Sequence, residues 1–220
     1  MIFDTEALPT GDVYKLLTAC VTPRPIAWVS TQDRQGRVNA APYSFFNAMG
    51  PNPPTVAIGM QADPVKGFKD SPRNVLETGE FVVNLVPKAL DAQMNLTAVD
   101  APTGVEELKL AGLTTAPSSK IAPPRIAESP VSFECVNLSS VVTGPAQVVV
   151  IGRVVAIHVA DPYVEDADRC WIDGRALDLI GRSYGAEYIL TRERYDMPRP
   201  DWQQWIADHP EHAPEDSDDG

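Results

Sequence analysis

The stretch from Pro23 to Asn84 contains the strings PRPIAWVST (residues 23–31), NAAPYSFFN (39–47), KDSPRN (69–74) and GEFVVN (79–84). Its apolar segments are short, rich in β-branched and aromatic residues, and separated by residues that favour turns. This spacing is typical of antiparallel strands, whereas a parallel sheet would require a long crossover between successive strands. The stretch therefore predicts a mainly β fold with a few short helices.

The same pattern continues along the rest of the chain. Strands are expected at residues 26–31, 55–60, 80–86, 131–138 and 147–159. A turn at residues 33–36 follows the first of them, with Gly36 available for a positive φ angle. Many short strands with frequent turns favour an antiparallel sandwich or barrel. The proline-rich stretch 112–130 is interpreted as a surface loop.

Helices are expected at residues 12–19, 72–78, 91–99 and 105–111. The second has clear end signals, because Ser71 suits the N-cap, Pro72 the first helical position and Gly79 the position after the end. Trp202 and Trp205 lie three residues apart, so a short final helix would place both rings on one face. We expect these rings to pack on the body of the protein or on a partner subunit.

The composition excludes several classes of function. A chain of 220 residues suits one domain with a sizeable core, and a net charge of −12 argues against nucleic acid as a partner. The sequence has no run of about 20 apolar residues, which argues against a membrane span, and its acidic start argues against secretion. Three cysteines without paired spacing argue against a disulfide framework or a zinc site and favour a cytoplasmic location. The acidic stretch 211–220 is expected to be a disordered tail, and the nearby His209 and His212 are a weak metal signal.

The string KDSPRN combines features of an anion site with those of an ordinary capped surface helix. A helix start exposes backbone N–H groups and partial positive charge, which favour a phosphate. Lys69 and Arg73 add positive charge, and Ser71 and Asn74 add hydrogen-bonding groups, whereas Pro72 removes one N–H donor. From this string alone, the capped helix is the simpler interpretation.

Two other segments also leave two interpretations open. NAAPYSFFN is either a strand with an aromatic core face or a ligand-site wall, with small residues for close approach and side chains that can hydrogen-bond. Arg24, held stiffly between two prolines, is either a fixed cation at a site or part of a surface salt bridge. A lone histidine on a strand, His158, is more often structural than functional.

Taken in order, these strings resemble the flavin reductase-like family, whose fold is the FMN-binding split β-barrel, an antiparallel barrel of the Greek-key type. The resemblance covers Tyr14 to Tyr188 and includes the ending Arg182-x-x-Gly185-x-x-Tyr188, with Ser-Tyr in place of the usual Leu-Gly at 183–184. It implies a split-barrel domain at residues 1–196, with 197–220 as a C-terminal extension.

The resemblance implies FMN as cofactor and NADH or NADPH as co-substrate. In relatives, a Lys-Asp-Thr-x-x-Asn phrase lies near the FMN phosphate, and the segment that matches residues 41–47 runs beside the isoalloxazine ring. A histidine in the region of His158 lies near the flavin or the nicotinamide. The residues thereby expected to contact the flavin are Arg24, Ser30, Thr31, Ala41, Pro42, Tyr43, Ser44, Asn47, Lys69, Asp70, Ser71, Asn74 and Arg182.

The expected function is that of an NAD(P)H-dependent flavin oxidoreductase, which passes hydride to FMN and on to an acceptor or a monooxygenase partner. Because the flavin supplies the chemistry, no catalytic side chain is required. The alternative is a flavoredoxin-like electron carrier that takes electrons from another protein. A third is a flavin-binding module without turnover, or a relative specialised for another ligand such as haem. Relatives place FMN at a subunit interface, so a homodimer is expected.

Overall fold

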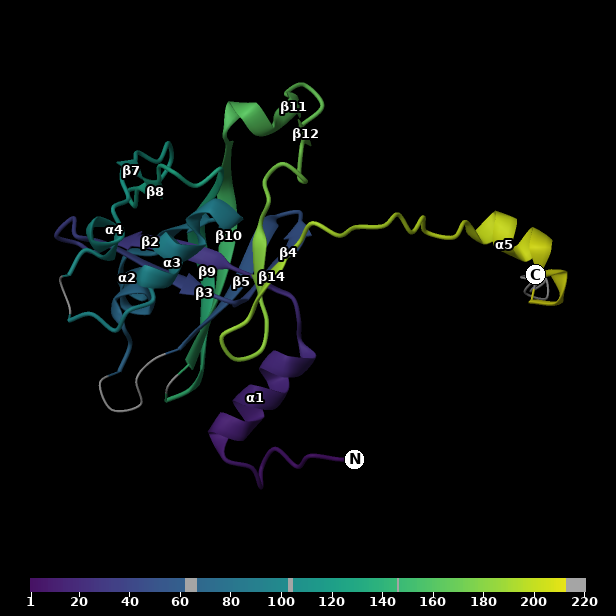
Figure 1. Ribbon diagram of the computed structural model, residues 1–220, viewed down its shortest axis with the longest axis horizontal. Coiled ribbons are helices and arrows are strands. Elements are labelled where there is room, and N and C mark those ends of the chain that lie inside the picture. Colours follow the sequence, from purple (N-terminus) through teal and green to yellow (C-terminus); the bar gives the residue numbers. More distant parts are fainter. Residues whose placement is uncertain (62–66, 103–104, 146, 213–220) are drawn as a thin grey trace, which may run out of the picture.

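The computed structural model describes residues 1–61, 67–102, 105–145 and 147–212 (Figure 1). Its helices are α1 (Thr10–Cys20), α2 (Asp70–Thr78), α3 (Asp91–Leu96), α4 (Glu107–Leu110) and α5 (Trp202–Asp208), with 3-10 turns at Lys88–Leu90, Asp161–Tyr163 and Pro210–His212. Its strands are β1 (Arg24–Pro25), β2 (Ala27–Gln32), β3 (Val38–Tyr43), β4 (Phe45–Pro51), β5 (Pro54–Gln61), β6 (Glu80–Asn84), β7 (Thr115–Ala116), β8 (Arg125–Ile126), β9 (Val131–Gly144), β10 (Gln147–Val159), β11 (Val164–Asp166), β12 (Trp171–Ile172), β13 (Ile180–Arg182) and β14 (Tyr188–Leu190). All five predicted strands and the four predicted helices are confirmed, to within a few residues at their ends.

A seven-stranded antiparallel sheet forms the body, in the order β3-β2-β6-β9-β10-β5-β4. Its two edge strands, β3 and β4, are consecutive in the chain and are separated only by Ser44. Tyr43 pairs with Ala27 of β2 on one side of this bend, and Phe45 pairs with Gly59 of β5 on the other. The sheet therefore closes on itself at Ser44 and opens away from it, which is how a split barrel forms.

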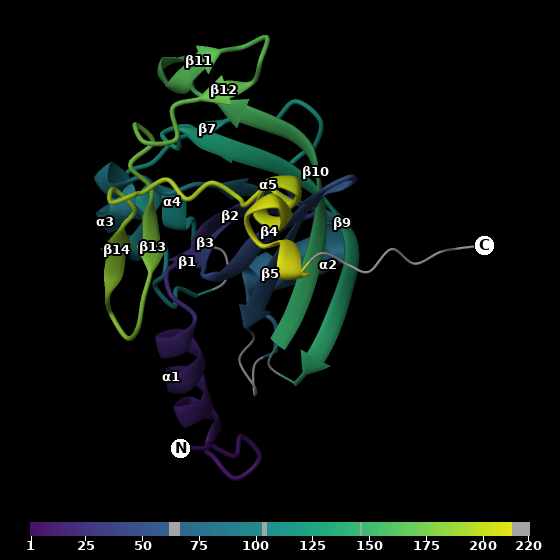
Figure 2. The ribbon, with the colours of Figure 1, turned by 90° about the vertical axis from the view of Figure 1, so that its right-hand side faces the viewer.

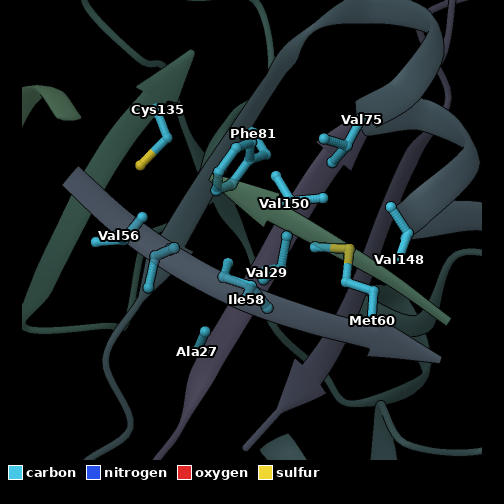
Figure 3. Packing of buried hydrophobic residues seen from close by; sticks show 11 residues of the cluster. Ala27, Val29, Val56, Ile58, Met60, Val75, Phe81, Cys135, Val148 and Val150 are labelled. Carbon is cyan, nitrogen blue, oxygen red and sulfur yellow. The ribbon is translucent and has the colours of Figure 1, made fainter. Parts of the chain in front are cut away.

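The main core lies inside this barrel (Figure 3). Side chains alternate between the two faces of a strand, and Val56, Ile58 and Met60 of β5 point inward and are fully buried. The aromatic ring of Phe81, on β6, packs among them and against Val150 of β10. The outward positions of β5, between these residues, remain partly exposed.

Gly152 of β10 provides a sharp test of this packing. A Cβ at this position would overlap Cζ of the buried Phe81 ring and approach its Cε1 to 3.0 Å. We expect Gly152→Ala to lower the free energy of unfolding by about 1–3 kcal/mol, because an overpacked core must shift its side chains. Gly50→Ala is the control, because a Cβ at Gly50 meets no atom within 4 Å. Urea unfolding of both variants measures the difference, and equal midpoints would contradict this account of the core.

A second core cluster lies on the other face of β2, under α3, α4 and β8. Trp28 is its largest member, and its indole N–H donates to Thr97 Oγ1 at 2.8 Å. The stretch 112–130 takes part in this cluster through the fully buried Ile126, so its prediction as a simple surface loop was wrong. A buried side chain anchors the backbone of this stretch, because Asn84 Oδ1 accepts a hydrogen bond from the Ile126 N–H at 3.0 Å.

Helix α2 begins earlier than predicted. Lys69 is its N-cap, without a side-chain cap hydrogen bond, so Ser71 and Pro72 lie inside the first turn and not at the cap and first position. Ser71 is buried, and its hydroxyl bonds to Asn39 instead of capping the helix. The predicted end is confirmed, because Gly79 adopts φ 77° and its N–H reaches Val75 O.

The predicted final helix is also present as α5, with the rings of Trp202 and Trp205 stacked at 5.6 Å. It does not pack on the body of the same chain. Figure 1 shows it at the end of an extended segment, well away from the barrel, and Figure 2 looks along this segment, with α5 in front of the barrel. Most of the predicted acidic tail, residues 213–220, lies outside the described residues. No helix in the described ranges is long and apolar enough to span a membrane.

Candidate flavin site

A cavity of about 770 Å³ opens beside the bend at Ser44, outside the barrel core. This volume lies within the usual range for small-molecule and cofactor sites. Its walls are β3, the start of α2, the segment 94–102 and the β13–β14 hairpin. Eight of the predicted flavin contacts line it, namely Ala41, Pro42, Tyr43, Ser44, Lys69, Asp70, Ser71 and Arg182.

One end of the cavity is suited to an anion. The N-terminus of the nine-residue helix α2 faces it with Asp70 and Ser71 in the first turn, where backbone N–H groups lack helical partners. Lys69 Nζ lies 3.2 Å from Asp100 Oδ1, and Arg73 pairs with Asp70. Two cations and a helix start together stabilise a phosphate.

A buried polar cluster forms the wall next to this end. With its amide oxygen turned toward Ser71, Asn39 accepts from Ser71 Oγ at 2.6 Å and from the Ala40 N–H at 3.2 Å, and it donates to Glu107 Oε1 at 3.1 Å. Burial raises the pKa of the Glu107 carboxyl above its ordinary value. Burial likewise raises the pKa of Tyr43 to about 12, although its hydrogen bond to Ser71 works in the opposite direction. Tyr43 therefore keeps its proton at any physiological pH.

Sequence reasoning missed Asn39 and Glu107. The signal for Asn39 was present, because residues 39, 41 and 43 alternate along β3 and all three line the cavity. Glu107 had no such signal, because α4 reaches β3 only through the tertiary fold.

The opposite wall is the β13–β14 hairpin. Arg182 of β13 donates to Gly185 O, and its guanidinium lies over the Tyr188 ring, 4.5 Å from the centroid. Both residues line the cavity. They add a cation and an aromatic face, which suit a ligand with both phosphate and flat rings.

Three residues expected to contact the flavin lie in the protein interior instead. Ser30 and Thr31 are fully buried on β2, a central strand with neighbours on both sides. Ser30 Oγ donates to Pro124 O at 2.6 Å, and Asn74 Nδ2 donates to Thr31 Oγ1 at 3.0 Å. These hydrogen bonds join β2 to α2 and to the 112–130 stretch, so the three side chains support the cavity wall from behind.

Two other predicted residues also lie outside the cavity lining. Asn47 is exposed on β4, and its Oδ1 accepts from the next backbone N–H at 2.8 Å. Arg24 is only 3% exposed and donates to the carbonyls of Thr18, Val21 and Ser183 at 2.7, 2.7 and 2.9 Å. Its charge is therefore used to hold the end of α1 against β13, and not as a surface salt bridge or as a free cation at the site.

His158 lies on β10 and does not line the cavity. Its Nε2 is 2.5 Å from Glu134 Oε1, and Glu134 is fully buried. The same carboxylate accepts from the backbone N–H groups of Ser119 and Lys120 at 2.6 and 2.7 Å. His158 thus belongs to a structural network. Among the described residues, no group of His, Cys, Asp and Glu is arranged to hold a metal ion.

Comparison with known proteins agrees with this fold. The family model for the flavin reductase like domain matches residues 19–178. An uncharacterized protein of Deinococcus radiodurans is 41% identical over 210 residues, which cover 92% of this chain and 91% of that protein. The crystal structure of nitrilotriacetate monooxygenase component B from Bacillus cereus has a TM-score of 0.84 at 34% identity, covering 90% of this chain and 98% of that one. The structure of 2-nitrobenzoate 2-nitroreductase from Pseudomonas fluorescens has a TM-score of 0.83 at 30% identity, covering 92% and 98%.

The chain belongs to the flavin reductase-like family, and its closed antiparallel sheet is the split β-barrel that the sequence predicted. Membership implies a flavin-binding oxidoreductase. The cavity fits a flavin nucleotide by the chemistry of its donors, because it combines a helix start and cations that suit a phosphate with small apolar positions on β3 and the hydroxyls of Tyr43 and Ser44.

Proposed function

We propose that this protein is an NAD(P)H-dependent flavin oxidoreductase that binds FMN in the cavity beside Ser44. The observation that carries the proposal is the convergence of Lys69, Arg73 and the start of α2 at one end of the cavity, next to the small residues of β3 that line its wall. A nucleotide with one terminal phosphate matches this asymmetry.

The residues have separate roles in the proposed site. Lys69, Arg73 and the first N–H groups of α2 would hold the phosphate. Ala41 and Pro42, on β3, present little side chain, so a flat ring can approach the backbone. Tyr43, whose pKa of about 12 keeps its hydroxyl protonated, remains a hydrogen-bond donor across physiological pH. A bound flavin supplies the hydride and electron transfer.

The proposal also covers the electron acceptor and the oligomeric state. Component B of a nitrilotriacetate monooxygenase is similar over 90% of this chain, which supports delivery of reduced flavin to a monooxygenase partner. The proposed protein is a cytoplasmic homodimer, and NADH or NADPH is its electron source. A flavoredoxin-like electron carrier is the alternative, in which another protein supplies the electrons.

An anaerobic absorption titration separates these functions. FMN is added to the purified protein, followed by NADH and, in a second sample, NADPH. Prompt bleaching of the flavin band, dependent on the protein, is the result expected of a reductase, and the faster nucleotide is the preferred one. A protein-bound flavin band that persists with both nucleotides would overturn the reductase and favour the carrier. Absence of any FMN binding would overturn both.

A further inference from the structure

Glu107, on α4, is a buried acid in the wall of the flavin cavity. Its side chain lines the cavity and is only 8% exposed. In the described part of the chain, no lysine or arginine forms an ion pair with it. The two cations at this end of the cavity, Lys69 and Arg73, are each paired with another carboxylate. A buried charge without a partner is costly, so such a group tends to take up a proton instead.

The charged groups around Glu107 favour its protonated form. Burial raises the pKa of the carboxyl, backbone hydrogen bonds work in the opposite direction, and the charge of Asp70 at the start of α2 raises it further. Tyr43, on β3, is neutral at physiological pH. On α4 itself, Glu106 and Lys109 pair with each other at the surface. A phosphate that enters beside Asp70 would add negative charge and raise the pKa of Glu107 again.

Asn39 links Glu107 to Ser71, and its amide can do so in two orientations. With the amide oxygen toward Ser71, Asn39 Nδ2 donates to Glu107 Oε1 at 3.1 Å, and Oδ1 accepts from Ser71 Oγ at 2.6 Å. With the amide reversed, Nδ2 donates to Ser71 Oγ at 2.6 Å, and Oδ1 faces Glu107 Oε1. Two acceptor oxygens form no hydrogen bond without a proton between them, so the second orientation requires a protonated Glu107.

The orientation of Asn39 decides where the hydroxyl proton of Ser71 goes. In the first orientation this proton is used in the bond to Asn39. In the second, Ser71 Oγ accepts from Asn39, and because a hydroxyl has its own proton as well as two lone pairs, the O–H can donate elsewhere. Ser71 lies in the first turn of α2 and lines the phosphate end of the cavity.

We infer that Glu107 takes up one proton from solvent when the phosphate of FMN enters the cavity, and that Asn39 then turns and frees the Ser71 hydroxyl to donate to the phosphate. Glu107 is thus a positioning residue that acts through Asn39 and Ser71. The proton removes a negative charge from beside the phosphate, and the turn of Asn39 adds a hydrogen-bond donor to it. The inference rests on the FMN binding of the proposed function and assigns how that binding depends on pH.

Calorimetric titration of the full chain with FMN tests this coupling. At each of pH 6, 7 and 8, two buffers with different ionisation enthalpies are used, so that the number of protons taken up is measured together with the dissociation constant. Glu107→Gln has nearly the same shape as the wild type and presents an N–H to Asn39, so it mimics the protonated acid and cannot take up a proton. Glu106→Gln is the control, because it removes a negative charge one residue away, outside the cavity lining.

The wild type and Glu106→Gln should both differ from Glu107→Gln. At pH 7 we expect them to take up more protons per FMN than Glu107→Gln, by a difference that approaches about one. The ratio of dissociation constants, wild type over Glu107→Gln, should rise by about tenfold between pH 6 and pH 8, because uptake of one proton changes affinity up to tenfold per pH unit. The phosphate of FMN also titrates near neutral pH, but it does so in all three proteins and cancels in the comparison.

Ser71→Ala tests the hydroxyl at the other end of the link. We expect this variant to lose more FMN affinity at pH 6 than at pH 8, because the hydroxyl donates to the phosphate only while Glu107 is protonated. Equal losses at the two pH values would contradict the role of Asn39 and overturn the inference.

The remaining outcomes separate this inference from the proposed function. Equal proton counts and a constant ratio of dissociation constants, in a protein that binds and reduces FMN, would overturn the inference alone. A wild type that binds no FMN at any pH would overturn both. Riboflavin, which has no phosphate, should bind the wild type without the extra proton, and the same uptake with both ligands would also overturn the inference. This last comparison needs no variant, so it decides the matter even if Glu107→Gln fails to fold.

Discussion

Replacing Lys69 and Arg73 together by alanine is expected to weaken FMN binding by about a hundredfold or more. A hydrogen bond to a charged group contributes about 1.5–3 kcal/mol, and about 1.4 kcal/mol corresponds to a tenfold change in affinity. Both side chains line the phosphate end of the cavity, and each is paired with an aspartate that is left without its cation in the variant. The remaining N–H groups of α2 should retain a weak affinity for the phosphate.

Riboflavin provides the matched ligand control, because it has the same ring and ribityl chain without the phosphate. Fluorescence titration should show that the double variant loses FMN affinity and keeps its riboflavin affinity nearly unchanged. Lys88→Ala is the matched protein control, because Lys88 forms an exposed pair with Asp91, outside the cavity lining. Equal losses for FMN and riboflavin would show that these residues support the fold and do not hold the phosphate.

The second large effect, a pH-dependent loss of folding stability, is expected when Glu134 is replaced. Burial alone would raise the pKa of this carboxyl, but the hydrogen bonds from the Ser119 N–H and from His158 outweigh it and lower the pKa to about 2. A carboxyl with a lowered folded-state pKa stabilises the protein above its unfolded value of 4.5 and loses that contribution as the pH falls toward 2. The difference corresponds to about 3 kcal/mol at neutral pH. We expect Glu134→Gln to lose most of it.

Guanidinium unfolding at pH 7 and at several points between pH 4.5 and 3 measures this effect. The stability difference between the wild type and Glu134→Gln should be largest at pH 7 and should shrink as the pH falls. Glu128→Gln is the control, because Glu128 also accepts two hydrogen bonds, from Thr114 N and Oγ1, but lies at the exposed surface. Its cost should stay below about 1 kcal/mol. A pH-independent loss at Glu134 would indicate a packing defect and not a lost charge.

The sequence predicted five of the strands, the helices, and eight of the 27 residues that line the cavity. Local pattern was sufficient for β2, β5, β6 and β10, because their alternating or continuous apolar residues are intrinsic to the chain. It was also sufficient for the end of α2, where Gly79 provides the left-handed residue that the cap needs. The prediction that Ser71 is the N-cap was wrong, because the Ser71 hydroxyl forms its hydrogen bond with the buried Asn39 side chain. A serine before a helix can cap it, but the sequence does not show whether a distant side chain will instead form a hydrogen bond with its hydroxyl.

The predicted site residues that lie outside the cavity lining have a common feature. Ser30, Thr31, Asn74 and Arg24 have the side chains that a nucleotide site requires, and the strings around them match the family. In the folded protein Ser30 donates to Pro124 O, Asn74 Nδ2 donates to Thr31 Oγ1, and Arg24 donates to backbone carbonyls, whereas Asn74 Oδ1 is buried without a partner. Polar groups removed from water generally find partners inside the protein. The direction in which a polar side chain points depends on which face of its strand is covered, and that is decided by distant segments.

The order of polar and apolar residues along the chain thus determines a mainly β chain with an anion-suited helix start, since those properties depend on neighbours a few residues apart. Only the tertiary structure decides that the sheet closes at Ser44, that Glu107 meets Asn39, and that the C-terminal segment carries α5 away from the barrel. These features depend on contacts between residues far apart in the sequence, and such contacts leave no local pattern from which they can be predicted.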